Sequence, residues 1–281
     1  MAVTVADIKK LREKTGAGPM ECKKALEEAN GDFAAAEKHL KEKGLAAVEK
    51  RSYRATNEGK IFIKAKDKRA VVVELASETD FVARNPEFIA LGDVIADRAL
   101  EKGYTAPNEE LSAVVTDLAA KIRENMSLKR LKLITAGETE YLASYIHGDG
   151  AIGIIVKLSA DKVIAQTNLE SFAYSIAMHI AAFSPLVLSK DKLDPSFIKE
   201  QEDIFRKQME ADESLKSKPV QALESILRGK LNKFLKSICL LDQGYIKDEK
   251  ITVAQALADT GKQLGASLAI VDYVYFKVGQ E

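Results

Sequence analysis

The sequence predicts an α+β protein, and three patterns carry that prediction. Short amphipathic segments separated by glycine and proline predict a three-helix module in residues 1–50. A strand hairpin followed by helix occurs twice, which predicts a core of two α/β subdomains with small antiparallel sheets, in residues 56–139 and 140–278. Two long amphipathic segments joined by a charged turn predict a protruding antiparallel helical hairpin in residues 195–238. A C-terminal module in residues 240–265, which includes the last helix, precedes the final strand.

Composition narrows the class of protein. With 281 residues, 46% of them hydrophobic, the chain can bury the cores of several small domains. Because 42 basic residues balance 42 acidic ones, no direct nucleic-acid partner is expected. The sequence has no apolar signal segment and no apolar run of about 18 residues, which predicts a cytoplasmic protein without membrane contact. Cys22 and Cys239 are expected to be free thiols, and the spacing of the histidines predicts no metal site. No cofactor is expected.

The N-terminal module is predicted from its helix boundaries. Thr4 is suited to cap a first helix, whose apolar stripe is Val5, Ile8 and Leu11. Pro19 begins a second helix that ends at Asn30-Gly31, and Asp32 begins a third that is expected to end at Gly44. The basic stretch that follows lacks periodicity, so residues 51–55 are predicted to be a linker.

The two subdomains are predicted from alternation and periodicity. The first has strands at 61–65 and 70–75, helices at about 86–102 and 108–126, and a third strand near Leu131. The second has strands at 141–147 and 151–158, which turn at Gly148-Asp149-Gly150, and then a helix at about 168–183. Because the hairpin-then-helix order repeats, an internal duplication is expected, although residue identities do not repeat.

The end of the chain continues this pattern. Pro195 and Pro219 begin the two helices of the hairpin, and the stretch between them is polar. If the hairpin projects, its apolar stripe needs a partner, so a homodimer through residues 195–238 is one hypothesis. The final helix is expected at about 252–264. Apolar residues on both faces of strand 268–278 predict that both faces are covered.

The segment Glu74–Arg84 is the most informative. A buried strand precedes it, and Asn85-Pro86 is typical of the start of a helix, so Thr79-Asp80-Phe81 is predicted to lie on a strand-to-helix turn. An aromatic beside a carboxylate on such a tip is costly unless a partner receives it. Phe81 could instead fold under the following helix as a core residue.

Four stretches, spread over nearly the whole chain, resemble the elongation factor Ts family. They are residues 11–26, the Thr79-Asp80-Phe81-Val82 tip, residues 145–148 with 177–182, and residues 218–234 with 242–246. Gly244 and Tyr245 depart from the proline and phenylalanine common there. The resemblance implies a ubiquitin-associated-like N-terminal module. It also implies guanine-nucleotide exchange on the GTPase elongation factor Tu, in which disturbance of the Mg²⁺ and phosphate site releases GDP.

The resemblance also implies which residues contact elongation factor Tu. Thr79, Asp80, Phe81 and Val82 are expected to form a wedge beside the Mg²⁺ subsite, and His147 to press on the phosphate side. The remaining expected contacts are Leu11, Arg12 and Met20 in the N-terminal module, Ile122 on a core helix, and Tyr245 and Ile246 in the C-terminal module.

The sequence leaves two other functions open. The chain could be a helix-binding scaffold or chaperone-like interaction protein without exchange activity. Less favoured is an acid–base enzyme that uses Asp80 and His147, with Glu78, because no phosphate loop, metal set or nucleophile motif accompanies them. His179 lies on an apolar helix and is interpreted as structural. Lys23 and Lys24 could lower the pKa of Cys22.

Overall fold

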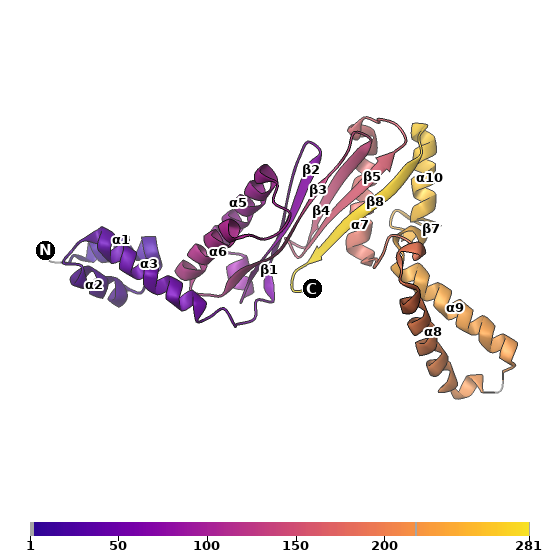
Figure 1. Ribbon diagram of the computed structural model, residues 1–281, viewed down its shortest axis with the longest axis horizontal. Coiled ribbons are helices and arrows are strands. Elements are labelled where there is room, and N and C mark those ends of the chain that lie inside the picture. Colours follow the sequence, from indigo (N-terminus) through magenta and orange to yellow (C-terminus); the bar gives the residue numbers. More distant parts are fainter. Residues whose placement is uncertain (1–2, 217, 281) are drawn as a thin grey trace. The chain divides into compact units, whose positions relative to one another are not determined.

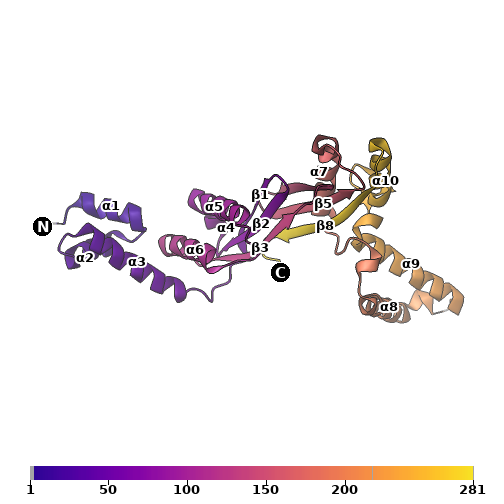
Figure 2. The same ribbon diagram turned by 45° about the horizontal axis from the view of Figure 1, so that its top comes forward.

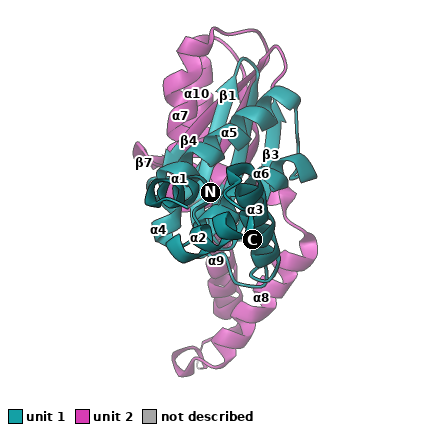
Figure 3. Ribbon diagram, turned by 90° about the vertical axis from the view of Figure 1, so that its left-hand side faces the viewer, with its two compact units in different colours: residues 1–135, 146–153, 276–281 teal, residues 136–145, 154–275 magenta. Residues whose placement is uncertain are grey.

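The computed structural model describes residues 3–216 and 218–280, which fall into two compact units (Figure 3). The first unit comprises residues 1–135, 146–153 and 276–281, and the second comprises residues 136–145 and 154–275. Helices combine with small sheets of two or three strands, which confirms the α+β class. In the part of the chain that the structure describes, no helix has the length and apolar character needed to cross a membrane.

The N-terminal module consists of three helices, as predicted (Figure 1). They are α1 (Val5–Thr15), α2 (Pro19–Glu28) and α3 (Phe33–Glu49). Thr4 and Asp7 form a capping box, in which the Asp7 N–H donates to Thr4 Oγ1 at 3.1 Å. The Asp32 carboxylate caps α3 by accepting from the N–H groups of Ala34 and Ala35.

The predicted end of the third helix at Gly44 is wrong, because α3 continues to Glu49. A Cβ added at Gly44 would lie 3.2 Å from the Cβ of Ala120 on α6 (Glu109–Ile122). The glycine therefore permits close approach of two helices, and its role is packing rather than termination.

The first sheet has the order β1-β2-β3, and all its neighbours are antiparallel. Its strands are β1 (Glu58–Lys66), β2 (Arg69–Ser77) and β3 (Met126–Thr135). Two helices, α5 (Pro86–Lys102) and α6, pack on one face, where Phe88 and Ile95 join the buried core (Figures 1 and 2). The α6 helix ends at Ile122, earlier than predicted, because Arg123 adopts the left-handed conformation as its C-cap.

The second sheet has the order β4-β5-β8, so in both sheets the second hairpin strand is central. Its strands are β4 (Glu140–His147), β5 (Ile152–Ala160) and β8 (Leu268–Lys277). The helix α7 (Gln166–Phe183) comes directly after β5, and the helix α10 (Val253–Leu264) comes directly before β8. Burial in β8 alternates, with Ile270, Val274 and Phe276 inside and Val271 exposed. The prediction that both faces of this strand are covered is therefore wrong, since its other face is only partly shielded.

The predicted helical hairpin consists of α8 (Pro195–Glu210) and α9 (Val220–Ile238), which extend away from the sheet of the second unit (Figure 1). The two helices bury apolar side chains against each other, including Phe205 and Phe234 in an edge-on aromatic contact with ring centroids 5.8 Å apart. Because much of the apolar stripe is covered within the hairpin, it does not need a second copy for burial. The homodimer stays a prediction. Beyond the hairpin, β6 (Gly244–Tyr245) pairs with β7 (Asp248–Thr252).

Candidate functional site

The Thr79–Val82 segment forms a short, well-anchored helical tip between β2 and α5. Thr79 caps the single turn α4 (Asp80–Ala83), since its Oγ1 accepts from the Val82 N–H at 3.4 Å. The same hydroxyl donates to the Glu124 carboxylate at 3.0 Å. Val82 and Ala83 are buried in the core, whereas the Phe81 side chain is 81% exposed. The predicted exposed aromatic tip is thus present, and the alternative of a buried Phe81 is not.

Charged side chains connect this tip to the turn of the second hairpin. Asp80 pairs with Arg84 one helical turn later at 3.1 Å. Lys60 donates to Asp149 at 2.6 Å and thereby lowers the pKa of the Asp149 carboxyl, and the charge of Arg84 acts in the same direction. Asp80, Arg84 and Asp149 therefore lie in one electrostatic neighbourhood of the first unit.

His147 is exposed at the end of β4, directly before that turn. Gly148, Asp149 and Gly150 have φ values of 61°, 54° and 92°, so the chain reverses through three consecutive left-handed residues. The carbonyl of Gly150 accepts from the Ile61 N–H at 2.8 Å, which fixes the turn to β1. The His147 backbone is therefore held in place relative to the same sheet that carries the Phe81 tip.

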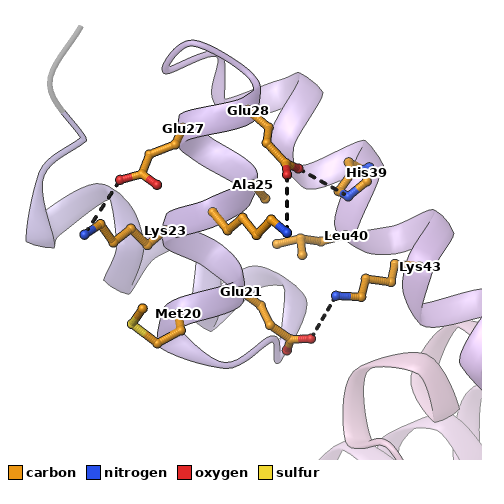
Figure 4. A pocket seen from close by; sticks show the side chains of 10 residues that line it. Met20, Glu21, Lys23, Ala25, Glu27, Glu28, His39, Leu40 and Lys43 are labelled. Atoms are coloured by element: carbon orange, nitrogen blue, oxygen red, sulfur yellow. Dashed lines mark hydrogen bonds and ion pairs between the residues drawn. The ribbon is translucent and has the colours of Figure 1, made fainter.

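In the N-terminal module the predicted contact residues differ sharply in exposure. Met20 is 74% exposed and Arg12 is exposed, but Leu11 is completely buried in the core of the module. Leu11 therefore has no free surface to offer a partner in this structure. Met20 borders an open groove between α2 and α3 of about 830 Å³, whose wall carries the ion pairs Lys23–Glu27 and Lys43–Glu21 (Figure 4).

The predicted C-terminal contacts are organised around the buried His179. The Ile246 N–H donates to His179 Nδ1 at 3.2 Å, so Nε2 carries the proton and donates to Gln243 Oε1 at 2.9 Å. Burial lowers the pKa of His179, although the bond to Gln243 opposes the shift. Tyr245 is buried beside Ser175, with 2.5 Å between the hydroxyl oxygens, whereas Ile246 is half-exposed. The interpretation of His179 as a structural residue is confirmed. The side chain of Tyr245 is buried beneath the 243–246 segment and supports it rather than forming its surface.

Ile122, the predicted contact on the core helix, is the last residue of α6 and is half-buried against the core of the first sheet. Cys22 is buried, and burial raises the pKa of its thiol, so its neighbouring lysines do not activate it. Both cysteines are free thiols.

The predicted acid–base cluster is not favoured by the geometry. Glu78 accepts from the Asn125 N–H at 2.6 Å and pairs with Arg54 at 3.4 Å. Its carboxylate therefore joins Arg54 to the residue that directly precedes β3. Asp80 is engaged by Arg84. Over residues 3–216 and 218–280, no group of three or more His, Cys, Asp or Glu side chains is arranged to hold a metal ion.

Several residues that shape the site were not predicted. Glu124, Arg84, Lys60 and Asp149 support the tip and the turn, yet only their positions in space identify them. A charged residue on a surface helix or turn has no sequence signal that distinguishes it from a solvated one.

Comparison with known proteins identifies the family. The family model described as Elongation factor TS matches residues 78–280. Elongation factor Ts of Treponema denticola is 47% identical over 281 residues, and the alignment covers 99% of each chain. The proteins of that name from Treponema pallidum (strain Nichols) and Borrelia hermsii are 41% and 38% identical, over 99% of this chain and 99% and 100% of theirs. This chain belongs to the elongation factor Ts family.

Proposed function

We propose that this protein is the guanine-nucleotide exchange factor of elongation factor Tu, and that it acts without making or breaking a covalent bond. Family membership supports the role. The observation that carries the mechanism is Phe81, which is 81% exposed on a turn whose base is capped and buried. An exposed aromatic on a rigid tip is suited to insertion into a partner's apolar pocket.

The mechanism follows from linkage. If the factor binds the nucleotide-free GTPase more tightly than the loaded one, it weakens nucleotide binding by the same ratio. Phe81 and Asp80 would enter beside the Mg²⁺ subsite, where displacement of the groups that hold the ion removes its neutralisation of the phosphates. His147 would act from the phosphate side. Because the tip and the His147 turn belong to one unit and share the Lys60–Asp149–Arg84 charges, they would engage the GTPase together.

Further contacts would come from Arg12 and Met20 in the N-terminal module, and from Ile122 and Ile246, which retain exposed surface. Leu11, Val82 and Tyr245 would support these contacts from the interior. No membrane or direct nucleic-acid partner forms part of this proposal.

Stopped-flow release of a fluorescent GDP from purified cognate elongation factor Tu tests the function. The native chain should accelerate release in proportion to its concentration and then saturate. If release proceeds at its spontaneous rate at every concentration, the proposal is refuted, and a scaffold that binds without exchange becomes the better explanation.

A further inference from the structure

Arg123 occupies a position that disfavours a side chain. It is the C-cap of α6, with φ 70° and ψ 22°, and its N–H donates to the carbonyl of Ala119. This left-handed conformation crowds a Cβ, so glycine is the usual residue there. An arginine at this position indicates that its side chain makes contacts that compensate for the backbone conformation.

The contacts of Arg123 lead to the N-terminal module and to the first residue of the linker that follows it. The Arg123 guanidinium pairs with Glu21 on α2 through a short charge-assisted hydrogen bond, while its carbonyl accepts from Arg51 Nη1 at 2.6 Å. Glu21 also accepts from Lys43 at 3.2 Å and from the Gly18 N–H at 3.1 Å. These bonds, with that from Arg123 the largest influence, lower the pKa of Glu21 to about 2, so the carboxylate is ionised at any physiological pH.

The backbone around this pair is shaped for close approach. Gly44 of α3 faces Ala120, and Gly16 after α1 faces the carbonyl of Lys121, where an added Cβ would collide with the oxygen. A second ion pair, Lys41 with Asp117 at 3.1 Å, also joins α3 to α6. Packing, charge and glycine placement therefore agree that α6 is a docking platform for the module.

We infer that Arg123 is a positioning residue that clamps the N-terminal module onto α6, and so fixes the exposed Met20 surface relative to the Phe81 tip. Met20 immediately precedes Glu21 on α2 (Figure 4), so the partner of Arg123 lies in the same helical turn as the surface that the clamp positions. The docking stands on the contacts alone, whereas its role in binding rests on the proposed function. When two contact surfaces are held in a fixed relation, the second engagement is intramolecular and gains effective concentration.

The variant Arg123→Gly tests the clamp without harming the helix end, because glycine suits the left-handed conformation. Glu21→Gln removes the carboxylate charge from the same pair, so the ionic part of the contact is lost, while a neutral oxygen remains for the Gly18 N–H. Ser184→Gly is the matched control. Ser184 is also a left-handed, non-glycine C-cap, with φ 45°, but it belongs to α7 in the second unit.

Two measurements on the full chain separate docking from exchange. Spin labels at Lys38→Cys and Lys102→Cys, both exposed, report the distance between module and core, while the buried Cys22 and Cys239 stay unlabelled. The native distribution should be narrow, and Arg123→Gly and Glu21→Gln should broaden it. In GDP-release assays both variants should raise the half-saturating factor concentration about two- to fivefold, as expected for the loss of one partly exposed ion pair, with the maximal rate unchanged.

Each outcome decides the inference. A broad native distribution, or narrow distributions in both variants, would overturn the clamp. Broadening without a change in half-saturation would overturn the positioning role. If Ser184→Gly behaves like Arg123→Gly, the effect comes from the left-handed cap and the inference fails. If the native chain gives no exchange at all, the proposed function fails, and the positioning role with it, while the distance measurement still decides the docking.

Discussion

Replacing Phe81 with alanine should weaken exchange without destabilising the protein. The side chain is 81% exposed, so its removal costs almost no core packing in the free factor. Full burial of a phenylalanine is worth roughly 1.5–3 kcal/mol. Because about four-fifths of that burial remains to be gained on binding, the loss should be about 1.2–2.4 kcal/mol, or about 8- to 60-fold in exchange efficiency.

The assay is stopped-flow release of fluorescent GDP, with urea unfolding of the factor measured in parallel. Tyr53→Ala is the matched control, since Tyr53 is an aromatic residue with 82% exposure that lies outside the tip. Tyr53→Ala should accelerate GDP release as efficiently as the native protein does. The reasoning is refuted if Phe81→Ala changes efficiency less than twofold, if Tyr53→Ala is equally damaging, or if Phe81→Ala lowers the free energy of unfolding substantially.

Three further predictions follow from the polar groups. Thr79→Ala removes the N-cap and the bond to Glu124, so it should lower the free energy of unfolding, measured by urea denaturation, by about 1 kcal/mol. Thr79→Ser keeps the hydroxyl and should retain most of the native stability. Equal losses in the two variants would contradict the capping role. Since burial lowers the pKa of His179 below its usual 6.5, the folded state favours the neutral ring, and stability should be complete above about pH 6.5 and decline as the pH falls through the folded pKa. His179→Gln should flatten this decline. If the free energy of unfolding depends on pH in the same way in the variant and the native protein, His179 is not its cause. Cys22 and Cys239 are buried with raised thiol pKa values, so both should react with a disulfide reagent at pH 8 only after denaturation, and rapid labelling of the native protein would disprove their burial.

The extent to which sequence predicts this fold depends on the range of the interactions involved. Boundaries set by local chemistry were predicted closely. Pro86 begins α5, Pro195 begins α8, and Asp32 caps α3, because each acts on its own turn of backbone. The local pattern predicts a helix stop at Gly44, which is wrong because this glycine accommodates Ala120, a residue far away in the chain.

The candidate site shows the same division. The place of Phe81 on a strand-to-helix turn follows from neighbouring residues, whereas its exposure follows only from the motif resemblance, because the residues alone also allow a buried Phe81. The support of the tip does not follow from neighbouring residues, because Glu124 is 45 positions from Thr79 and Asp149 is 89 positions from Lys60. Leu11 shows the converse, since a motif match alone does not tell a residue that forms the surface from one that supports it.

The way in which the tip is anchored bears on how much of its burial energy can reach the partner. Ordering a flexible loop on binding would consume part of that energy as lost conformational entropy. Here the ordering already exists in the free factor, because Thr79 caps the turn, Val82 and Ala83 anchor it in the core, and Arg84 holds Asp80. Binding therefore has to order little more than the Phe81 ring itself. A rigid tip with a single exposed aromatic can thus direct most of its burial energy into discrimination between the open and nucleotide-bound forms of a GTPase, which is what exchange requires.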